Sequence, residues 1–304
     1  MNNLLTDVKN LELETLKNLK SSKALNTLRA YKADYKDFAG FCIKHGFKVM
    51  PSEPKIISLY LTHLSKTSKF STLKRRLASI SVVHRLSGHY IDTKHPMITE
   101  NLMGIKRAKG SYQKAKKPIL INDLKLIIKV INEDNKEHLR DKALILVGFA
   151  GGFRRSELVN LENEEMEFVN EGVKILIKRS KTDQSGEGII KAIPYFENHE
   201  FCPVIALKEH VKNKFVNTNK EKIFKISDKS VALILKKYAQ KAGLDPTKYS
   251  GHSLRSGFAT TAAEFGAEER NIMAMTGHKT TQMVRRYIQE ANLFKNNALN
   301  KIKF

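Results

Sequence analysis

The chain has 304 residues, 41% of them hydrophobic, so it can bury a substantial core, and its length favours two ordinary domains over one large one. It carries 54 Lys or Arg against 31 Asp or Glu, a formal charge of +23 that exceeds what solubility requires and indicates a polyanionic partner. No stretch is apolar over the roughly 18 residues that a membrane span needs, and the first ten residues lack a signal-peptide pattern. Nucleic acid is therefore favoured over an anionic membrane. Residues 1–117 alone hold 23 Lys or Arg and 8 Asp or Glu, a net charge of +15.

The two cysteines, Cys42 and Cys202, lie too far apart in the sequence to form a CxxC metal or redox pair. The sequence therefore predicts reduced thiols in a cytoplasmic protein, with no disulfide framework, no metal site and no cofactor. No internal repeat or low-complexity tract is present.

Apolar residues at helical spacing run through residues 1–108, interrupted by residues that begin or end helices. The predicted helices extend from Ser21 to Gly46, from near Ser52 with Pro54 in the first turn, from about Ser71 to Gly88, and onward from Pro96. No strand pattern separates them. Residues 1–108 are therefore predicted to form an all-helical domain.

The third of these helices places basic and small residues along one stripe, beside the apolar one. A helix of this kind can approach a phosphate backbone closely, although a solvated surface explains the same pattern equally well. The charge of the whole chain favours DNA contact. The candidate DNA-binding residues of this domain are Lys74, Arg75, Arg76, Arg85, Lys106 and Arg107.

A basic segment with almost no apolar residues follows the fourth helix and ends at Pro118. The domain boundary is predicted there, with residues 109–118 as the linker. A solvated linker and a strap along the DNA backbone are both compatible with this composition.

Residues 119–304 show a different pattern. Asn122 is expected to cap a helix that carries Leu124, and a strongly apolar helix follows through Val147. Residues 173–180 and 188–195 look like two strands joined as a hairpin, and the clearest later helices are Lys229–Lys241, His252–Glu264 and Thr280–Gln289. The predicted fold class is mainly α, with a small β-hairpin or sheet and two domains.

Two segments carry arginines at places suited to binding a phosphate. In AGGFRRSEL, two glycines end the apolar helix and Arg154 precedes a new helix, so its guanidinium fork can face an anion. In SGHSLRSGF, His252 and Arg255 stand one helical turn apart and share a face. Each signal alone is weak, because arginines beside helix starts and structural histidines are common.

Two further segments carry side chains that can exchange a proton. In TGHKTTQMVRRYI, His278 precedes a helix that carries Tyr287, and the two side chains meet if that helix folds back across the site. A tyrosine on an amphipathic helix is usually a packing residue. In KRSKTDQSGEG, Lys181 follows the first hairpin strand, with Lys178, Arg179 and Lys191 as rivals.

Taken together, Arg154, Lys181, His252, Arg255, His278 and Tyr287 resemble the catalytic residues of the tyrosine recombinase, or phage integrase, family. The joint match is specific although each piece is weak. The segment FSTLKRRLASISVVHRLSG is also similar to the DNA-facing helix of Cre-like and Xer-like members. The resemblance implies a helical core-binding domain over 1–108, the linker, and a tyrosine recombinase catalytic domain with a C-terminal tail over 119–304.

The resemblance further implies a site-specific recombinase that cuts and rejoins double-stranded DNA through a 3′-phosphotyrosine. In such a site Arg154 and Arg255 stabilise the transition state, and His252 assists as proton acceptor or phosphate ligand. His278 donates a hydrogen bond and Lys181 protonates the 5′ oxygen. Glu157 is expected to hold the site by pairing with an arginine.

The implied assembly is a homotetramer on synapsed DNA sites. The free protein is expected to be a monomer or weak oligomer in the cytoplasm, associated with the nucleoid, and to have no membrane partner. The tail after Tyr287 is expected either to dock on a neighbouring subunit or to pack on its own chain. A type IB topoisomerase uses a similar set of residues. A non-catalytic DNA-binding or architectural protein derived from this fold is the alternative from another class.

Overall fold

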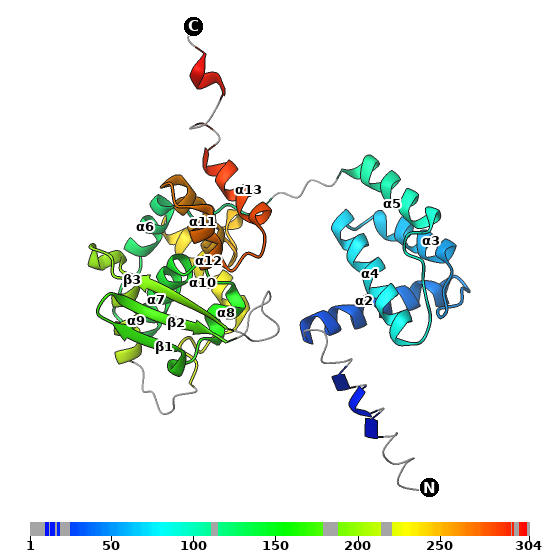
Figure 1. Ribbon diagram of the computed structural model, residues 1–304, viewed down its shortest axis with the longest axis horizontal. Coiled ribbons are helices and arrows are strands. Elements are labelled where there is room, and N and C mark those ends of the chain that lie inside the picture. The colour runs from blue at the N-terminus through cyan, green and yellow to red at the C-terminus, as the bar shows by residue number, and fades with distance from the viewer. Residues whose placement is uncertain are drawn as a thin grey trace. The chain divides into compact units, whose positions relative to one another are not determined.

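The computed structural model describes residues 10–11, 13–15, 17–18, 25–110, 115–178, 188–213, 221–292, 294 and 298–302 (Figure 1). The chain divides into two compact units, Met1–Lys114 and Ala115–Phe304, each with a hydrophobic core of its own. None of the described helices is long and apolar enough to cross a bilayer.

The first unit is made of helices that lie where the apolar spacing predicted them. They are α2 (Leu25–Lys44), α3 (Pro54–Ser65), α4 (Phe70–Leu86) and α5 (Pro96–Lys109). Proline occupies the first position of both α3 and α5, where its missing N–H costs no hydrogen bond. The core between the helices is built around aromatic rings, with Phe38 and Tyr60 packed edge to face at 5.2 Å.

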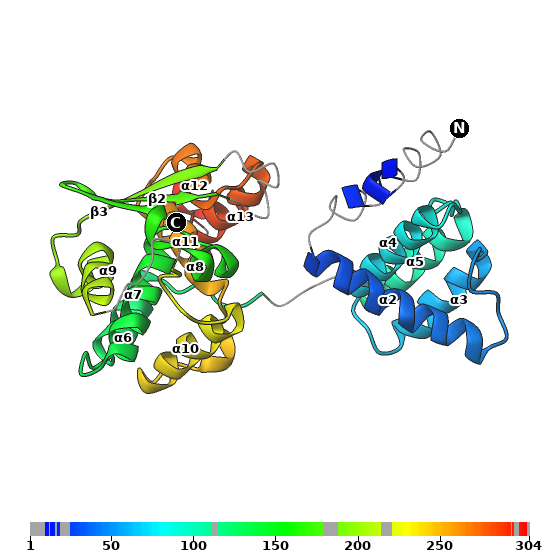
Figure 2. The same cartoon turned by 90° about the horizontal axis from the view of Figure 1, so that it is seen from below.

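The second unit combines helices with one small sheet. Its elements are α6 (Ile121–Lys129), α7 (Lys136–Ala150), α8 (Arg155–Asn160), η1 (Asn163–Glu165), β1 (Met166–Val169), β2 (Gly172–Ile177), β3 (Ile189–Pro194), η2 (His199–Phe201), α9 (Pro203–Lys212), α10 (Asp228–Lys241), η3 (Pro246–Lys248), α11 (Ser253–Glu264), α12 (Glu269–Thr276), α13 (Thr281–Asn292) and η4 (Ala298–Lys301). The three strands are antiparallel in the order β1-β2-β3. Figure 2 shows the sheet along one side of the unit, with most of the helices packed against its other side.

The predicted hairpin is strands β2 and β3, and β1 is an addition that the sequence did not reveal. β1 has four residues and no fully buried position, so its pattern is too short to stand out. It pairs with β2 from Met166↔Ile175 to Val169↔Gly172. In β2 the alternation is clear, because Val173, Ile175 and Ile177 face the core.

The expectation that Asn122 caps a helix is wrong. Helix α6 begins at Ile121, and its N-cap is Leu120, whose side chain provides no capping hydrogen bond. Asn122 therefore lies inside the first turn. The start of α6 is fixed by tertiary contacts instead, since the preceding Ile119 donates a 3.0 Å hydrogen bond to the carbonyl of Ser253.

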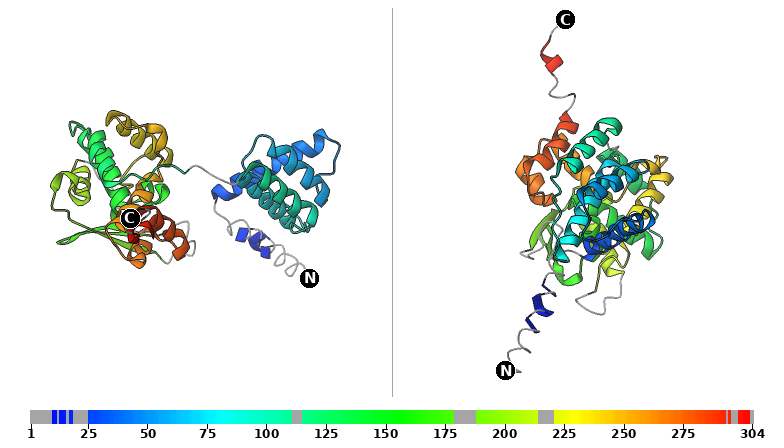
Figure 3. Two further views of the ribbon diagram at one scale, coloured as in Figure 1. Left: turned by 90° about the horizontal axis from the view of Figure 1, so that it is seen from above. Right: turned by 90° about the vertical axis from the view of Figure 1, so that its right-hand side faces the viewer.

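Helix α11 packs against the buried helix α7. It also packs against α12 and α13, so that α11, α12 and α13 lie side by side (Figures 1 and 3). Gly257 allows α11 to approach the segment that precedes α6, because a Cβ at that position would lie 2.0 Å from the carbonyl oxygen of Ile119. The ends of α7, α11 and α12 are thereby brought to one place, and the chemistry-bearing residues gather there.

Candidate active site

The turn after α7 presents Arg154. Gly152 adopts a φ of +55°, in the left-handed region, and a Cβ there would come within 3.0 Å of Phe258 and 3.2 Å of Thr276. Only glycine fits both the backbone conformation and the space. The chain therefore reverses directly after the helix, and Arg154 becomes the N-cap of α8.

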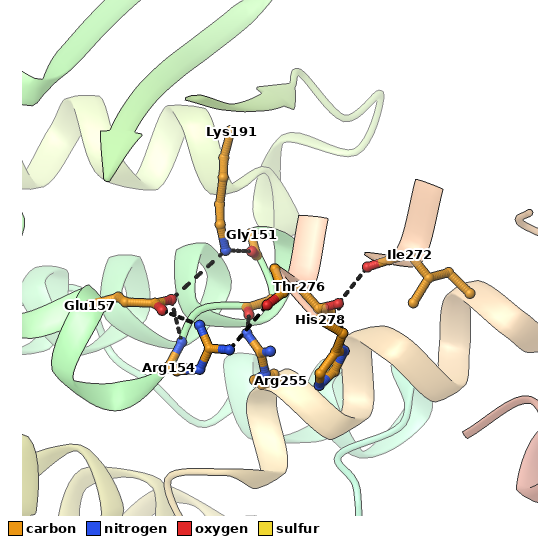
Figure 4. A network of polar contacts seen from close by, with 10 residues as sticks. Gly151, Arg154, Glu157, Lys191, Arg255, Ile272, Thr276 and His278 are labelled. Carbon is orange, nitrogen blue, oxygen red and sulfur yellow. Dashed lines mark hydrogen bonds and ion pairs between the residues drawn. The ribbon is translucent and has the colours of Figure 1, made fainter. Parts of the chain in front are cut away.

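Arg154 is held from two sides by groups of the protein (Figure 4). Its Nη1 donates to Glu157 Oε1 at 2.5 Å, and its Nη2 donates to the carbonyl of Gly277 at 3.2 Å. The other carboxylate oxygen of Glu157 accepts the backbone N–H of Arg154 at 3.0 Å. The Glu157 side chain is 3% exposed and that of Arg154 is 17% exposed, so the guanidinium is oriented but still reaches solvent.

Arg255 lies in the first turn of α11 and is 1% exposed. It is the largest of the fully buried side chains among the described residues. Its Nη1 donates to the carbonyl of Gly152 at 2.9 Å, while its buried Nη2 meets no acceptor among the described residues. Burial, followed by repulsion from Arg154, lowers the pKa of Arg255 to about 10, so the group stays charged at neutral pH. A buried cation with one unpaired donor is a place for an anion.

Lys191 enters the same cluster from β3. It is buried on the inner face of the strand and pairs in register with Ile175. Its Nζ donates to the carbonyl of Gly151 at 2.7 Å and lies 4.0 Å from Glu157 Oε2 (Figure 4). Burial lowers the pKa of Lys191 to about 7. Lys191 thus supports the turn that presents Arg154.

Helix α13 folds back so that Tyr287 meets His252. The phenol oxygen lies 3.4 Å from Nε2 of His252, the N-cap of α11. The Tyr287 ring is half-buried and packs on a small cluster that includes Ala259 and Val284. Loss of hydration, and then the charges of Arg255 and other nearby arginines, lower the pKa of His252, which favours the neutral ring.

His278 follows the left-handed Gly277 that ends α12. Its Nδ1 lies 2.8 Å from Oγ1 of Thr276, and its ring centroid lies 6.0 Å from that of Tyr287. Burial, followed by the charges of Arg255 and Arg154, lowers the pKa of His278 to about 4. Both histidines of the site are therefore neutral at pH 7.

The structure brings five of the six predicted catalytic residues into one cluster and places Glu157 in contact with Arg154. The five are Arg154, His252, Arg255, His278 and Tyr287. Lys181, the sixth, lies outside the described residues. Helix α13 folds back, and the rings of Tyr287 and His278 lie near each other, which is the condition that the sequence analysis set for a shared site.

Two residues of the cluster had no assigned role from the sequence. Lys191 was only a rival for the position of Lys181. A signal for it exists, because period-two alternation puts Lys191 on the same face as Ile193, facing the core. Thr276 has no such signal, since its contacts are with a carbonyl one turn back and with a loop residue.

The cluster has an excess of positive charge. Arg154, Lys191 and Arg255 share one carboxylate, that of Glu157, within the part of the chain that the structure describes. Such a site suits an anion that accepts several hydrogen bonds, such as a phosphodiester. No three His, Cys, Asp or Glu side chains among the described residues are grouped so that they could hold a metal ion.

The predicted DNA-binding residues of the first unit differ in their surroundings. Arg75 and Arg76 both pair with the buried carboxylate of Asp34, which Ser79 also contacts, and only 17% of the Arg76 side chain is exposed. The remaining four side chains are exposed: Lys74, Arg85, Lys106 and Arg107. Arg76 therefore serves the packing of α4 against α2.

Comparison with known proteins gives related sequences over the length of the chain. Residues 119–293 match the phage integrase family. The chain is 42% identical over 307 residues to the integrase/recombinase xerD homolog of Selenomonas ruminantium, covering 96% of this chain and 89% of that protein. It is 25% identical over 271 residues to the tyrosine recombinase XerC of Staphylococcus haemolyticus, covering 88% and 87%. The fold resembles that of the XerH site-specific recombinase bound to palindromic difH substrate, with a TM-score of 0.68 at 16% identity over 94% of this chain and 84% of that one.

Proposed function

The chain belongs to the phage integrase family and is a tyrosine site-specific recombinase, and on this premise we propose that Tyr287 attacks a DNA phosphate to form a 3′-phosphotyrosine. One observation carries the proposal. The phenol of Tyr287 lies 3.4 Å from a histidine nitrogen, in the cluster where Arg255 keeps a buried donor without an acceptor among the described residues. A nucleophile, a proton acceptor and an anion site are thus adjacent.

The magnitudes fit this chemistry. Forming the anion of an ordinary tyrosine at pH 7 costs about 4 kcal/mol. An oriented donor aimed at the charge of a transition state contributes roughly 3 to 4 kcal/mol. Arg154 and Arg255, on the two non-bridging oxygens of the phosphate, supply enough stabilisation to offset the cost of the phenolate.

Proton transfers complete the step. The phenol O–H bond breaks as His252 Nε2 accepts the proton, the phenol oxygen bonds to phosphorus, and the bond from phosphorus to the 5′ oxygen breaks. We assign protonation of that 5′ oxygen to Lys181. Lys191, its rival, already donates to Gly151 and so acts as a support. The phosphotyrosine keeps the energy of the phosphodiester, and religation by the 5′ hydroxyl needs no ATP.

We assign the two units different tasks on the DNA. Residues 1–108 form the core-binding domain, 109–118 the linker, and 119–304 the catalytic domain. The charge of +15 over residues 1–117 supports a clamp whose affinity comes mainly from phosphate contacts and falls steeply with salt. A recombinase of this kind works where chromosomal DNA is, in the cytoplasm and on the nucleoid.

Recombination of two duplexes exchanges four strands, so we propose that four copies of the chain assemble on synapsed sites. The C-terminal tail supports this assembly, because it exposes the large apolar side chains of Phe294, Leu299 and Ile302. An exposed apolar tail of this kind suits a pocket on a neighbouring subunit. The free protein is then a monomer or a weak oligomer.

The proposal is tested in two steps. The protein first selects a binding site from random duplexes, and it is then incubated with a nicked duplex that carries this site. The nick traps the cleaved strand, and a covalent adduct migrates slowly on a denaturing gel. Tyr287→Phe is expected to abolish the adduct and leave the affinity for the duplex unchanged, while Tyr90→Phe, at an exposed tyrosine of the first unit, keeps both. An adduct that survives in Tyr287→Phe contradicts the assignment. Relaxation of plasmid DNA without recombinant product would favour a topoisomerase.

A further inference from the structure

The hydroxyl of Thr276 contacts two groups at once. Its Oγ1 lies 2.6 Å from the carbonyl oxygen of Ile272 and 2.8 Å from Nδ1 of His278 (Figure 4). Thr276 is completely buried, with 0% of its surface exposed. The position of one hydrogen therefore decides the hydrogen bonding of the histidine.

That hydrogen must point to Ile272. The carbonyl oxygen of Ile272 can only accept a hydrogen bond. If the hydroxyl hydrogen pointed elsewhere, this oxygen and Oγ1 of Thr276 would face each other as two acceptors at 2.6 Å. Oγ1 has a single hydrogen and thus accepts its second bond from His278. The imidazole must then carry a proton on Nδ1.

The other nitrogen of the ring is bare in this arrangement. The groups that face His278 are Arg255 of α11, Arg154 before α8, His252, Lys191 of β3 and Tyr287 of α13. Burial and the cations among these groups lower the pKa of His278 to about 4, so at neutral pH the ring holds one proton. With that proton on Nδ1, Nε2 presents a lone pair.

We propose that Thr276 is a positioning residue that fixes His278 in the Nδ1–H tautomer, so that His278 can bind the target phosphate only after Nε2 takes up a proton. The inference rests on the proposed function, because it concerns the same phosphate. The non-bridging oxygens of a phosphodiester only accept, and a bare Nε2 beside them would be repelled. The incoming anion offsets the positive charges around the ring and raises the pKa of His278. One proton from solvent then forms an N–H bond at Nε2, and the imidazolium donates to the phosphate.

The consequence is a site whose charge increases when the target is bound. In the free protein His278 adds no charge to the cluster of Arg154, Lys191 and Arg255. In the bound state it adds one positive charge and one donor. Binding is therefore linked to proton uptake, and affinity rises as the pH falls toward the range in which the free ring itself is protonated.

Nitrogen-15 NMR of the full chain with labelled histidine measures the tautomer directly, because long-range correlations distinguish a protonated from a bare ring nitrogen. The His278 signals are assigned by their loss in His278→Gln. At pH 7 the wild type is expected to show Nδ1 protonated and Nε2 bare. Thr276→Val keeps the shape but removes the hydroxyl, and should shift the ring toward Nε2–H, whereas Thr276→Ser should restore the wild-type pattern.

Thr260→Val is the matched control, since Thr260 is a buried threonine of α11 whose hydroxyl has no partner among the described residues. It should leave the His278 signals unchanged. A protonated Nε2 in the free wild type, or an unchanged tautomer in Thr276→Val, overturns the role of Thr276. Either result leaves the adduct assay of Tyr287 unaffected, so failure of this inference is distinct from failure of the proposed function.

Sulfate is the probe for proton uptake, because it carries no proton at pH 6 and can only accept. Titrating sulfate at pH 6 into wild-type protein labelled at both histidine and arginine should protonate Nε2 in step with a shift of the Arg255 side-chain resonance, which is assigned by its loss in Arg255→Lys. In Thr276→Val the ring can donate from Nε2 without an added proton, so the sulfate affinity should depend less on pH. Sulfate binding with Nε2 still bare overturns the linkage, and no binding at all contradicts the anion site itself.

Discussion

Arg255 Nη1 donates a 2.9 Å hydrogen bond to the carbonyl of Gly152, so a side chain of α11 is tied to the turn that ends α7. The bond uses one arm of the guanidinium and leaves the other, Nη2, for an anion. Because the turn also presents Arg154, this bond sets the distance between the two arginines. The position of positive charge in the site is therefore fixed by the backbone.

Arg255→Lys should slow cleavage by about a hundredfold, because an ammonium cannot bond both Gly152 and a phosphate with the geometry of the planar fork. The measurement is the single-turnover rate of adduct formation on the nicked duplex. Arg270→Lys, at an exposed arginine of α12, is the control and should react at the wild-type rate. Equal rates for Arg255→Lys and wild type would remove Arg255 from the reaction.

Glu157→Gln should lower both stability and activity. The carboxylate is the acidic partner of Arg154 and lies 4.0 Å from Lys191, and its loss leaves buried positive charge without a counterion. Breaking a buried ion pair costs about 3 kcal/mol, which urea denaturation can resolve. Glu167→Gln, whose pair with Lys174 is exposed, should cost less than about 1 kcal/mol. Equal losses in the two variants would contradict the structural role of Glu157.

Lys191→Met should change how stability depends on pH. Burial lowers the pKa of Lys191 from 10.5 to about 7 in the folded chain, so between these values the unfolded chain binds more protons. The contribution of Lys191 to the free energy of unfolding therefore increases as the pH rises from 7 to 10.5. The increase is at most about 1.4 kcal/mol per pH unit. The variant lacks this gain.

Urea denaturation at pH 7 and pH 9 measures the effect as the difference between wild type and variant. Lys174→Met, at an exposed position of β2, is the control and should track the wild type. The same Lys191 variant should slow cleavage by roughly ten- to hundredfold, because the turn before Arg154 loses its support. If the stability of the wild type relative to Lys191→Met does not rise between pH 7 and pH 9, the pKa of Lys191 is not low.

Arg85→Ala and Arg76→Ala should separate DNA contact from packing in the first unit. Arg85 is exposed, and its removal should reduce the slope of log affinity against log salt by about 1. Arg76 is tied to Asp34, so its removal should leave the salt slope unchanged and lower the stability of the helical unit. The measurements are DNA titrations at several salt concentrations and thermal unfolding of each variant. A reduced slope for Arg76→Ala would show that it contacts phosphate.

The sequence by itself determined what depends on near neighbours in the chain. Helical spacing and proline positions placed α2 to α5, and alternating apolar residues placed β2 and β3, because these patterns reflect hydrogen bonds and faces within a few residues. The residue types of the site were also legible. Arg154, Arg255 and Tyr287 stand in short segments whose joint spacing is specific even though each alone is weak.

Only the tertiary structure decided which groups share a partner. The start of α6 came from Ile119 bonding Ser253 and not from a cap at Asn122, and Lys191 proved to be a buried support. The contact between the Thr276 hydroxyl and His278 Nδ1, on which the proposed tautomer rests, and the second nitrogen of Arg255, left over after the first bonds a carbonyl 103 residues away, were also visible only in the fold. Most of these contacts join segments that are distant in sequence, and the one between Thr276 and His278 depends on burial under those segments. Their strength comes from the exclusion of water, which no local pattern records.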